Sequence, residues 1–270
     1  DSTNEPLLEV RNLSKTFYTP STLLKPKEAF TAVKNVSFSV NRGETVGIVG
    51  ESGSGKSTIG RMILGLEDIT EGSVIYRGKD LKLITDSTER RAHCLSMQCI
   101  FQDPYSSLNP RMSAGENITY GLKIHNLIDN HKAESLAQDL MSLVGLKRED
   151  ADKLPHAFSG GERQRIGIAR SLAYRPDFIF CDEPTSALDV SVQANLLNLL
   201  KDLQEQFSLT LLFVSHDLAV IRQMCDRVIV MKDGEALEND SNDNIFEQPK
   251  HAYTRSLLDS MPKFQGLAQY

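Results

Sequence analysis

One glycine-rich segment constrains the fold of this chain more than any other part of its sequence. It reads Gly50-Glu51-Ser52-Gly53-Ser54-Gly55-Lys56-Ser57-Thr58 and matches the pattern GxxxxGK[ST] in full. The apolar run Thr45–Val49 predicts a buried strand before it, and helical spacing over residues 57–66 predicts a helix after it. Glycines let the backbone wrap around phosphate oxygens, which the N–H groups at a helix N-terminus then face. This context predicts a strand–loop–helix unit that binds phosphate, rather than a chance glycine-rich turn.

Four side chains near this loop have predicted chemical roles. Lys56 is expected to reach the β- and γ-phosphates of a nucleotide, and Ser57 to bind Mg²⁺. A second apolar run, at 178–181, predicts a buried strand that ends in Asp182 and Glu183. Open α/β sheets build sites at strand C-termini, so we expect Asp182 to hold Mg²⁺ through water and Glu183 to polarise the attacking water. Acidic turns are common, but this one accompanies a phosphate-binding loop and therefore indicates nucleotide hydrolysis.

Strand and helix patterns alternate along most of the chain. Apolar runs and period-two runs predict strands at 7–15, 32–40, 73–76, 211–214 and 228–231, and the Asp233-Gly234 turn predicts another at 235–237. Helical spacing predicts helices at 167–173, 190–207 and 218–225. Residues 113–145 have a helical pattern without a strand, which indicates an inserted helical subdomain. The alternation implies a mainly parallel sheet covered on both faces.

Two segments fall outside this alternation. Residues 19–27 contain two Pro and no clear period, so we predict a loop and assign it no function. Residues 241–270 form a polar tail that also contains two Pro. Cys94 and Cys99 have C-x4-C spacing beside a strand, and we expect no metal there.

The composition excludes several classes of protein. Of 270 residues, 36 are acidic and 30 basic, and the net charge of -6 argues against a broad nucleic-acid-binding surface while leaving a local basic patch open. No apolar run approaches the roughly 20 residues of a membrane-spanning helix. Residues 1–6 are acidic and polar, so we expect no secretory signal. The Cys residues form no CxxC pair, so we expect no disulfide scaffold, and the cytosol fits.

A further segment resembles the signature motif of the ATP-binding-cassette (ABC) ATPases, which usually reads LSGGQ. It is Phe158-Ser159-Gly160-Gly161-Glu162, with Phe158 in place of Leu and Glu162 in place of Gln. The Ser-Gly-Gly core is retained. It can place a hydroxyl and backbone N–H groups against a phosphate at a helix N-terminus. The resemblance implies that this segment closes over ATP held by Lys56 of another subunit.

The remaining motifs of the ABC family follow in order. Gln102 matches the Gln of the Q-loop, which in the family reaches Mg²⁺ and water and couples to the helical subdomain. Asp189, at the end of residues 186–189, matches the D-loop. His216 matches the switch His that contacts the γ-phosphate. A lone His is more often structural, but its place among these motifs favours the functional assignment.

The aromatic residue that stacks on adenine in this family corresponds to Phe17 or Tyr18. The choice stays open, although Phe17 fits the usual spacing after Lys15 better. A lone aromatic residue usually belongs to the core, so this assignment also rests on the order of the motifs.

The resemblance implies a full set of site residues. The implied catalytic residues are Glu183, His216 and Gln102, and the implied Mg²⁺ ligands are Ser57, Gln102 and Asp182. The implied ATP-binding residues are Phe17 or Tyr18, Gly50, Glu51, Ser52, Gly53, Ser54, Gly55, Lys56, Ser57, Thr58, Ser159, Gly160, Gly161, Glu162 and Asp189.

The resemblance also implies the fold class and the domain organisation. We expect the ABC ATPase fold: an α/β P-loop NTPase core, with a mainly parallel sheet covered by helices and an antiparallel β subdomain, plus an inserted α-helical subdomain. The ABC ATPase domain is expected at 1–240, with a RecA-like core at about 1–100 and 172–240 and a helical subdomain at about 103–171. Residues 241–270 are expected to be a C-terminal tail of the oligopeptide-transporter type.

Two segments resemble one subfamily, the ATPases of oligopeptide/dipeptide (peptide/nickel/opine) importers. Residues 101–112 are similar to its extended Q-loop, and 251–258 are similar to its HPYTRxLL element, with Ala252 in place of Pro. Some members carry an iron–sulfur cluster in the tail. This chain has no Cys after Cys225, so we expect no cluster.

The resemblance implies an ATPase that energises a membrane importer and uses ATP and Mg²⁺. The implied partners are two transmembrane permease subunits, a second ABC ATPase subunit in a homo- or heterodimer and, indirectly, a solute-binding protein, with no nucleic acid. The permease helices are expected to dock near Gln102 and the helical insertion. The implied location is the cytoplasmic face of the inner membrane of a bacterium or archaeon. Peptides are the leading cargo, with nickel, opines and sugars as alternatives.

Two other functions are open to a chain with these motifs. A soluble ABC ATPase of translation or DNA repair would generally carry two cassettes or large insertions, which this sequence lacks. A nucleotide-binding scaffold would not need the carboxylate of Glu183.

Overall fold

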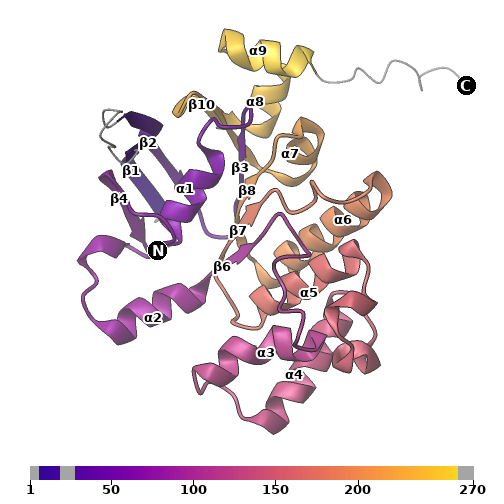
Figure 1. Ribbon diagram of the computed structural model, residues 1–270. Helices are drawn as coiled ribbons and strands as arrows, with labels where there is room; N and C mark the ends of the chain where they lie inside the picture. Colours follow the sequence, from indigo (N-terminus) through magenta and orange to yellow (C-terminus); the bar gives the residue numbers. More distant parts are fainter. Residues whose placement is uncertain (1–5, 19–27, 261–270) are drawn as a thin grey trace, which may run out of the picture.

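The structure is a computed structural model that describes residues 6–18 and 28–260 (Figure 1). The loop predicted at 19–27 and the end of the predicted tail lie outside the described residues. Within the described residues the chain forms two β-sheets with helices packed around them.

The larger sheet carries the strands that lead to the predicted site. Its strand order is β10-β9-β3-β8-β7-β6, and only β10 runs antiparallel to its neighbour. The strands are β3 (Thr45–Val49), β6 (Met97–Ile100), β7 (Phe178–Asp182), β8 (Thr210–Val214), β9 (Arg227–Lys232) and β10 (Glu235–Ser241). Because β3, β6, β7 and β8 are parallel, their C-terminal ends meet at one edge of the sheet.

The smaller sheet is antiparallel and has the order β2-β1-β4-β5. Its strands are β1 (Leu8–Tyr18), β2 (Ala29–Val40), β4 (Glu71–Tyr76) and β5 (Lys79–Asp80). It packs on one face of the larger sheet, with α1 (Lys56–Ile63) sharing the same core.

The remaining helices surround the sheets in four groups. Helices α5 (Gly160–Leu172), α6 (Val190–Phe207) and α7 (Leu218–Met224) share a core with the other face of the larger sheet. Helices α3 (Ala114–Ile124) and α4 (Asn130–Leu143) gather at one end of the molecule (Figure 1), beside the short helices η2 (Arg148–Asp152) and η3 (Pro155–Ala157). Helices α8 (Asn242–Glu247) and α9 (Ala252–Asp259) lie at the opposite end, and η1 (Leu81–Leu83) and α2 (Ser87–Ser96) follow β5.

The side chains of strand β7 alternate between two hydrophobic cores. Phe178 and Phe180 are buried in the cluster with α1 and the smaller sheet, whereas Ile179 and Cys181 are buried in the cluster with α5 and α6. Successive side chains of a strand point to opposite faces, so a fully apolar run is what a sheet covered on both sides requires. The contact with α1 is close: a Cβ on Gly60 would lie 2.0 Å from the Phe180 ring. This packing brings the N-terminus of α1 next to the end of β7.

The structure confirms the predicted fold class. The predicted bounds of β3 and α6 agree with the structure. The helix predicted at 167–173 begins about seven residues earlier, at Gly160, and the other predicted strands and helices differ by smaller amounts. The prediction omitted α2, β5, β6, α8 and α9 as elements. Residues 113–145, predicted as helical, form two helices separated by a turn.

Candidate active site

The glycine-rich loop joins β3 to α1 and fits closely against its neighbours. A Cβ on Gly50 would lie 2.2 Å from the carbonyl oxygen of Met231, and one on Gly55 would lie 2.4 Å from that of Ala32. Gly55 also has a φ of 98°, a conformation that glycine adopts without strain. The Gly234 N–H donates to the carbonyl of Ser54 at 3.1 Å. The β9–β10 turn and β2 therefore hold the loop from outside, and glycine is required where they touch it.

The loop and three distant segments border one cavity of about 440 Å³. The first residues of helix α1 line this cavity. Its N-cap, Gly55, makes no side-chain hydrogen bond to the N–H groups of the first turn, so these groups can bind an anion. The lining residues are Ser52, Gly53, Gly55, Lys56, Ser57, Thr58, Gln102, Glu183 and His216. The structure thus brings together the loop with all three predicted catalytic residues.

Lys56 lies inside the curl of the loop. Its Nζ donates to the carbonyl oxygens of Gly50 at 2.8 Å and Glu51 at 2.9 Å. Burial lowers the pKa of Lys56, while the charges of Glu183 and Asp182 raise it. The two carboxylates favour the ammonium form, which is the form that binds phosphate.

Ser57 and Asp182 connect the loop to the end of β7. The Ser57 hydroxyl donates to Oδ1 of Asp182 at 2.6 Å. Burial raises the pKa of Asp182, and the Ser57 hydrogen bond opposes this shift. Hydroxyl and carboxylate oxygens such as these are hard donors that Mg²⁺ prefers, and Gln102, which lines the cavity, carries an amide oxygen of the same kind. No group of three or more His, Cys, Asp or Glu side chains in the described residues could hold a metal ion.

Glu183 and His216 both line the cavity, and their side chains are in contact. Glu183 Oε2 and His216 Nδ1 are 3.0 Å apart, and the Glu183 side chain is 17% exposed. Glu183 has a φ of 46°, which is uncommon for a residue other than glycine and is concentrated at functional sites. Its N–H donates to the carbonyl of Val214 at 3.0 Å, which ties the turn to β8. The arrangement can orient a water molecule and accept its proton.

The predicted signature segment does not line this cavity. Ser159 is the N-cap of α5, and it forms a capping box in which its hydroxyl accepts from the Glu162 N–H and the Glu162 carboxylate accepts from the Ser159 N–H. Gly160 and Gly161 occupy the first turn of the same helix, where a Cβ on Gly161 would lie 2.4 Å from Val192. None of Ser159, Gly160, Gly161 and Glu162 is among the described residues that line the 440 Å³ cavity.

The remaining predicted ATP-binding residues are not among those that line the cavity. Asp189 is the N-cap of α6 without a side-chain hydrogen bond to the helix. Phe17 and Tyr18 end β1 and are 38% and 57% exposed. Gly50, Glu51 and Ser54 belong to the loop but are not among the residues that line the cavity.

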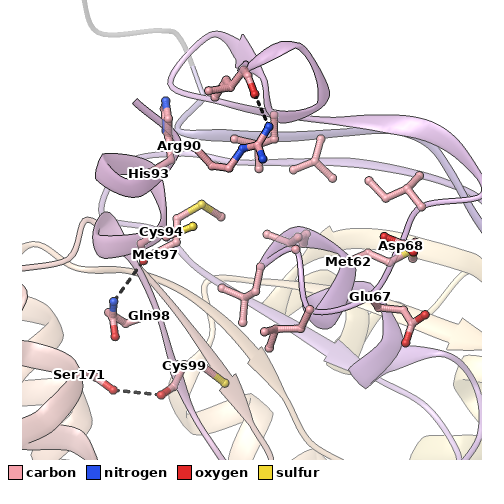
Figure 2. A pocket seen from close by; sticks show the side chains of 18 of the residues that line it. Met62, Glu67, Asp68, Arg90, His93, Cys94, Met97, Gln98, Cys99 and Ser171 are labelled. Carbon is pink, nitrogen blue, oxygen red and sulfur yellow. Dashed lines mark hydrogen bonds between the residues drawn. The ribbon is translucent and has the colours of Figure 1, made fainter. Parts of the chain in front are cut away.

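Figure 2 shows a second, larger cavity of about 960 Å³. The end of α1, helix α2, strand β6 and helix α5 border it, and its lining includes Phe101, the neighbour of Gln102. The sequence predicts no site at these residues, and α2 and β6 are not among its predicted elements. No helix of the described residues is both long and apolar enough to cross a membrane.

Comparisons with known proteins agree with this geometry. A family model described as "ABC transporter" matches residues 33–186. A putative peptide import ATP-binding protein of Brucella ovis is 48% identical over 262 residues, which cover 96% of this chain and 80% of that protein. The oligopeptide transport ATP-binding protein OppF of Bacillus subtilis is 46% identical over 259 residues, with 96% and 83% covered.

Solved structures give the same result. The dimeric, post-hydrolysis structure of the ATP-binding cassette MJ0796 bound to ADP and Pi has a TM-score of 0.75 and 32% identity, and the match covers 87% of this chain and 98% of that one. The family model spans more than half of the chain, and relatives of nearly one-half identity span almost all of it. This chain belongs to the ABC transporter family, as an ATPase with the ABC cassette fold.

Proposed function

We propose that this ABC ATPase drives a membrane importer for peptides or a related small solute. The observation that carries the proposal is the cavity in which Lys56, Glu183 and His216 meet. Relatives named for peptide import and oligopeptide transport support the class of cargo. A soluble ABC ATPase that is not coupled to transport is the alternative, and these relatives do not favour it.

The chain's own groups suit the steps of ATP hydrolysis. Lys56 and the first N–H groups of α1 would bind the β- and γ-phosphates. Ser57, Gln102 and Asp182 would hold Mg²⁺, which supplies charge neutralisation at these phosphates when bound. Glu183, oriented by its turn and by His216, would position the attacking water and accept its proton.

A second subunit would complete the site. The N-terminus of α5 consists of Ser159, Gly160, Gly161 and Glu162, and these residues do not line the cavity. We propose that they contact the nucleotide of a partner cassette, with Asp189 near the interface. The related cassette MJ0796 was solved as a dimer, which supports this arrangement. Phe17 or Tyr18, both partly exposed at the end of β1, would stack on adenine.

The 960 Å³ cavity is the proposed docking site for the transmembrane permease subunits. Apolar side chains such as Met62 and Met97 line it, while Glu67, Asp68 and Arg90 provide charges at its border (Figure 2). Its wall includes Phe101, so a docked permease helix would contact the residue before Gln102. This contact offers a direct route from permease movement to the hydrolysis site.

The proposed assembly contains two permease subunits, a second ATPase subunit and, through the permeases, a solute-binding protein, at the cytoplasmic face of the inner membrane. We further propose that residues 1–240 are the ATPase domain, with a RecA-like core at about 1–100 and 172–240 and a helical subdomain at about 103–171. Residues 241–270 would be a tail specific to this subfamily.

Co-purification tests the proposed assembly. The tagged chain is recovered from mild-detergent extracts of its native membranes, and its partners are identified by mass spectrometry. We expect two multi-span proteins and a related ATPase, with a solute-binding protein encoded or recovered alongside them. Recovery only from the cytosol, with ribosomes or repair proteins, would contradict the importer and leave the ATPase chemistry intact.

A further inference from the structure

A buried glutamine connects two segments of the active site. Gln164 lies in α5 and is 2% exposed. Its Nε2 donates to the carbonyl oxygen of Phe101 at 2.9 Å and to that of Pro184 at 2.8 Å. An amide nitrogen carries two protons, so both of its donors are used. One side chain therefore holds two backbone groups that are far apart in the sequence.

Each accepting carbonyl adjoins a residue of the cavity. Phe101 precedes Gln102 where the chain leaves β6, and Pro184 follows Glu183 where it leaves β7. The ladder between these strands ends at the pair Ile100 and Cys181. Beyond that pair β6 has ended, and β7 continues only to Asp182, which pairs with Val214 of β8. The Gln164 amide holds the two segments together where the strand hydrogen bonds no longer do.

The turn at Glu183 needs such support. Its φ of 46° is a strained conformation for this residue, and it persists only where the surroundings fix it. The Glu183 N–H is held by Val214 on one side, and the Pro184 carbonyl is held by Gln164 on the other. Loss of the amide would also leave the buried Pro184 carbonyl and the partly buried Phe101 carbonyl without this donor.

Gln164 shares its helix with the signature segment. Helix α5 begins at Gly160, directly after its N-cap Ser159, so Gln164 lies near the start of the same rigid element. A displacement of α5 that moves Ser159 therefore moves the Gln164 amide as well. The two carbonyls bonded to that amide belong to the segments that carry Gln102 and Glu183.

We propose that Gln164 is a positioning residue that sets the separation of Gln102 and Glu183 and makes it depend on the placement of α5. The proposal rests on the functions proposed above for Gln102 and Glu183 in hydrolysis. It adds that the rate of hydrolysis depends on the position of α5, the helix that follows Ser159, through the side-chain amide of Gln164.

The chain offers a matched control for a purely structural role. Gln204, in α6, donates through Nε2 to the carbonyl oxygens of Gly43 at 2.7 Å and Leu209 at 3.0 Å. It makes the same pair of hydrogen bonds as Gln164. Among the described residues, neither Gln204 nor its two acceptors line the 440 Å³ cavity.

The test compares Gln164→Met with Gln204→Met in the full chain. Met has a similar volume and lacks both donors, so each variant loses the same hydrogen bonds. Both are expected to lower the Tm. Gln164→Met should lower kcat by about 10- to 100-fold, because a small misplacement of catalytic groups has effects of that size. Its KM for MgATP should change by less than about threefold, because phosphate binding is not altered, while Gln204→Met should keep the kcat of the wild type.

Equal loss of kcat in the two variants would overturn the proposal, since it would reflect lost stability alone. Wild-type kcat in Gln164→Met, in an assay where Glu183→Gln abolishes turnover, would overturn it while leaving the proposed function intact. Wild-type kcat in Glu183→Gln would instead overturn the function assigned to Glu183 and the proposal with it.

A second variant covers the case in which Gln164→Met does not fold. Gln164→Asn keeps the amide but is one methylene shorter, so it cannot reach both carbonyls. Hydrogen exchange of the backbone N–H groups at residues 101–104 and 183–186 is then compared with that of the wild-type chain. Faster exchange in both segments is expected, and unchanged exchange would contradict the proposal.

Discussion

The hydroxyl of Ser57 donates to Oδ1 of Asp182 across 2.6 Å, which joins the first turn of α1 to the last residue of β7. This bond exists because α1 packs directly on β7, with Gly60 against the Phe180 ring. The glycine therefore contributes to the geometry of the proposed Mg²⁺ site without touching it. Two oxygens that we propose as Mg²⁺ ligands thus come together from separate segments through the fold itself, which would lower the entropic cost of metal binding.

Asp182→Asn is expected to raise the Mg²⁺ concentration needed for half-maximal ATPase activity by about tenfold or more, because an amide lacks the carboxylate charge. ATPase rates measured against Mg²⁺ concentration check this result. Asp177→Asn is the matched control, since Asp177 precedes the same strand and pairs with Arg77 at 2.5 Å. An unchanged Mg²⁺ requirement in Asp182→Asn would contradict the assignment.

The Mg²⁺ requirement should also depend on pH. Burial raises the pKa of Asp182, so its proton competes with Mg²⁺ at higher pH than the proton of an ordinary Asp would. Acidification from neutral pH should therefore raise the half-maximal Mg²⁺ concentration, and it should do so less in Asp182→Asn. The reverse trend with pH in the wild-type chain would contradict this expectation.

Glu183→Gln is expected to lower kcat by about 100- to 10,000-fold, the range for loss of a positioned proton acceptor, with ATP binding retained. His216→Ala should lower kcat less, because it removes the proposed γ-phosphate contact but keeps the proposed proton acceptor Glu183, which lies 3.0 Å from His216. Single-turnover rates and ATP affinities distinguish these effects from lost binding. His131→Ala, at an exposed position of α4, serves as the control for loss of an imidazole. Equal slow hydrolysis in wild type and Glu183→Gln would support a nucleotide-binding scaffold instead.

Strong local patterns made much of the fold predictable. Strand β3 is buried at every position and α6 has a continuous apolar stripe, so both were predicted with their observed bounds. Helix α2 buries only His93 and Ser96, and its polar sequence carries no apolar period. Helices α8 and α9 have 6 and 8 residues and are held by polar contacts such as Thr254 with Glu238, which no period reveals.

The predictability of the site follows the same distinction. The glycine-rich loop and the pair Asp182 and Glu183 are consecutive in the chain, so local sequence was sufficient to locate them. The two hydrogen bonds from Gln164 to the carbonyl oxygens of Phe101 and Pro184 form only when three distant segments fold together. The Asp233-Gly234 turn was predicted, but its hydrogen bond to Ser54 depends on tertiary packing.

The C-terminal helix gives a stability prediction. Glu238 in β10 accepts from the Thr254 hydroxyl at 2.6 Å and from the Lys250 and His251 N–H groups. Thr254→Val should lower the free energy of unfolding by roughly 1.5–3 kcal/mol, the range for a hydrogen bond to a charged group. Tyr253→Phe is the neighbouring control, since it removes a hydroxyl next to Thr254 that is not among the hydrogen-bond partners of Glu238 in the described part of the chain. Denaturant titration compares the two variants.

This effect should weaken at low pH. Burial raises the pKa of Glu238, but the hydrogen bonds from Thr254 and from the Lys250 and His251 N–H groups outweigh it, so the pKa lies below that of an ordinary Glu. A depressed carboxyl pKa stabilises the fold above the unfolded-state pKa and loses that contribution as pH falls through the folded-state value. The difference between wild type and Thr254→Val should therefore shrink on acidification, and a constant difference would contradict this account.

Cysteine labelling tests the proposed permease docking site. Cys94 is exposed and lines the 960 Å³ cavity, whereas burial raises the pKa of Cys99, in the same cavity, to about 12. Because the thiolate is the reactive form, a maleimide should modify Cys94 in the isolated chain and leave Cys99 unmodified at neutral pH. A docked permease should slow the labelling of Cys94 in the purified complex, with Cys94→Ser as the blank. Equal labelling rates with and without the permease subunits would show that they dock elsewhere.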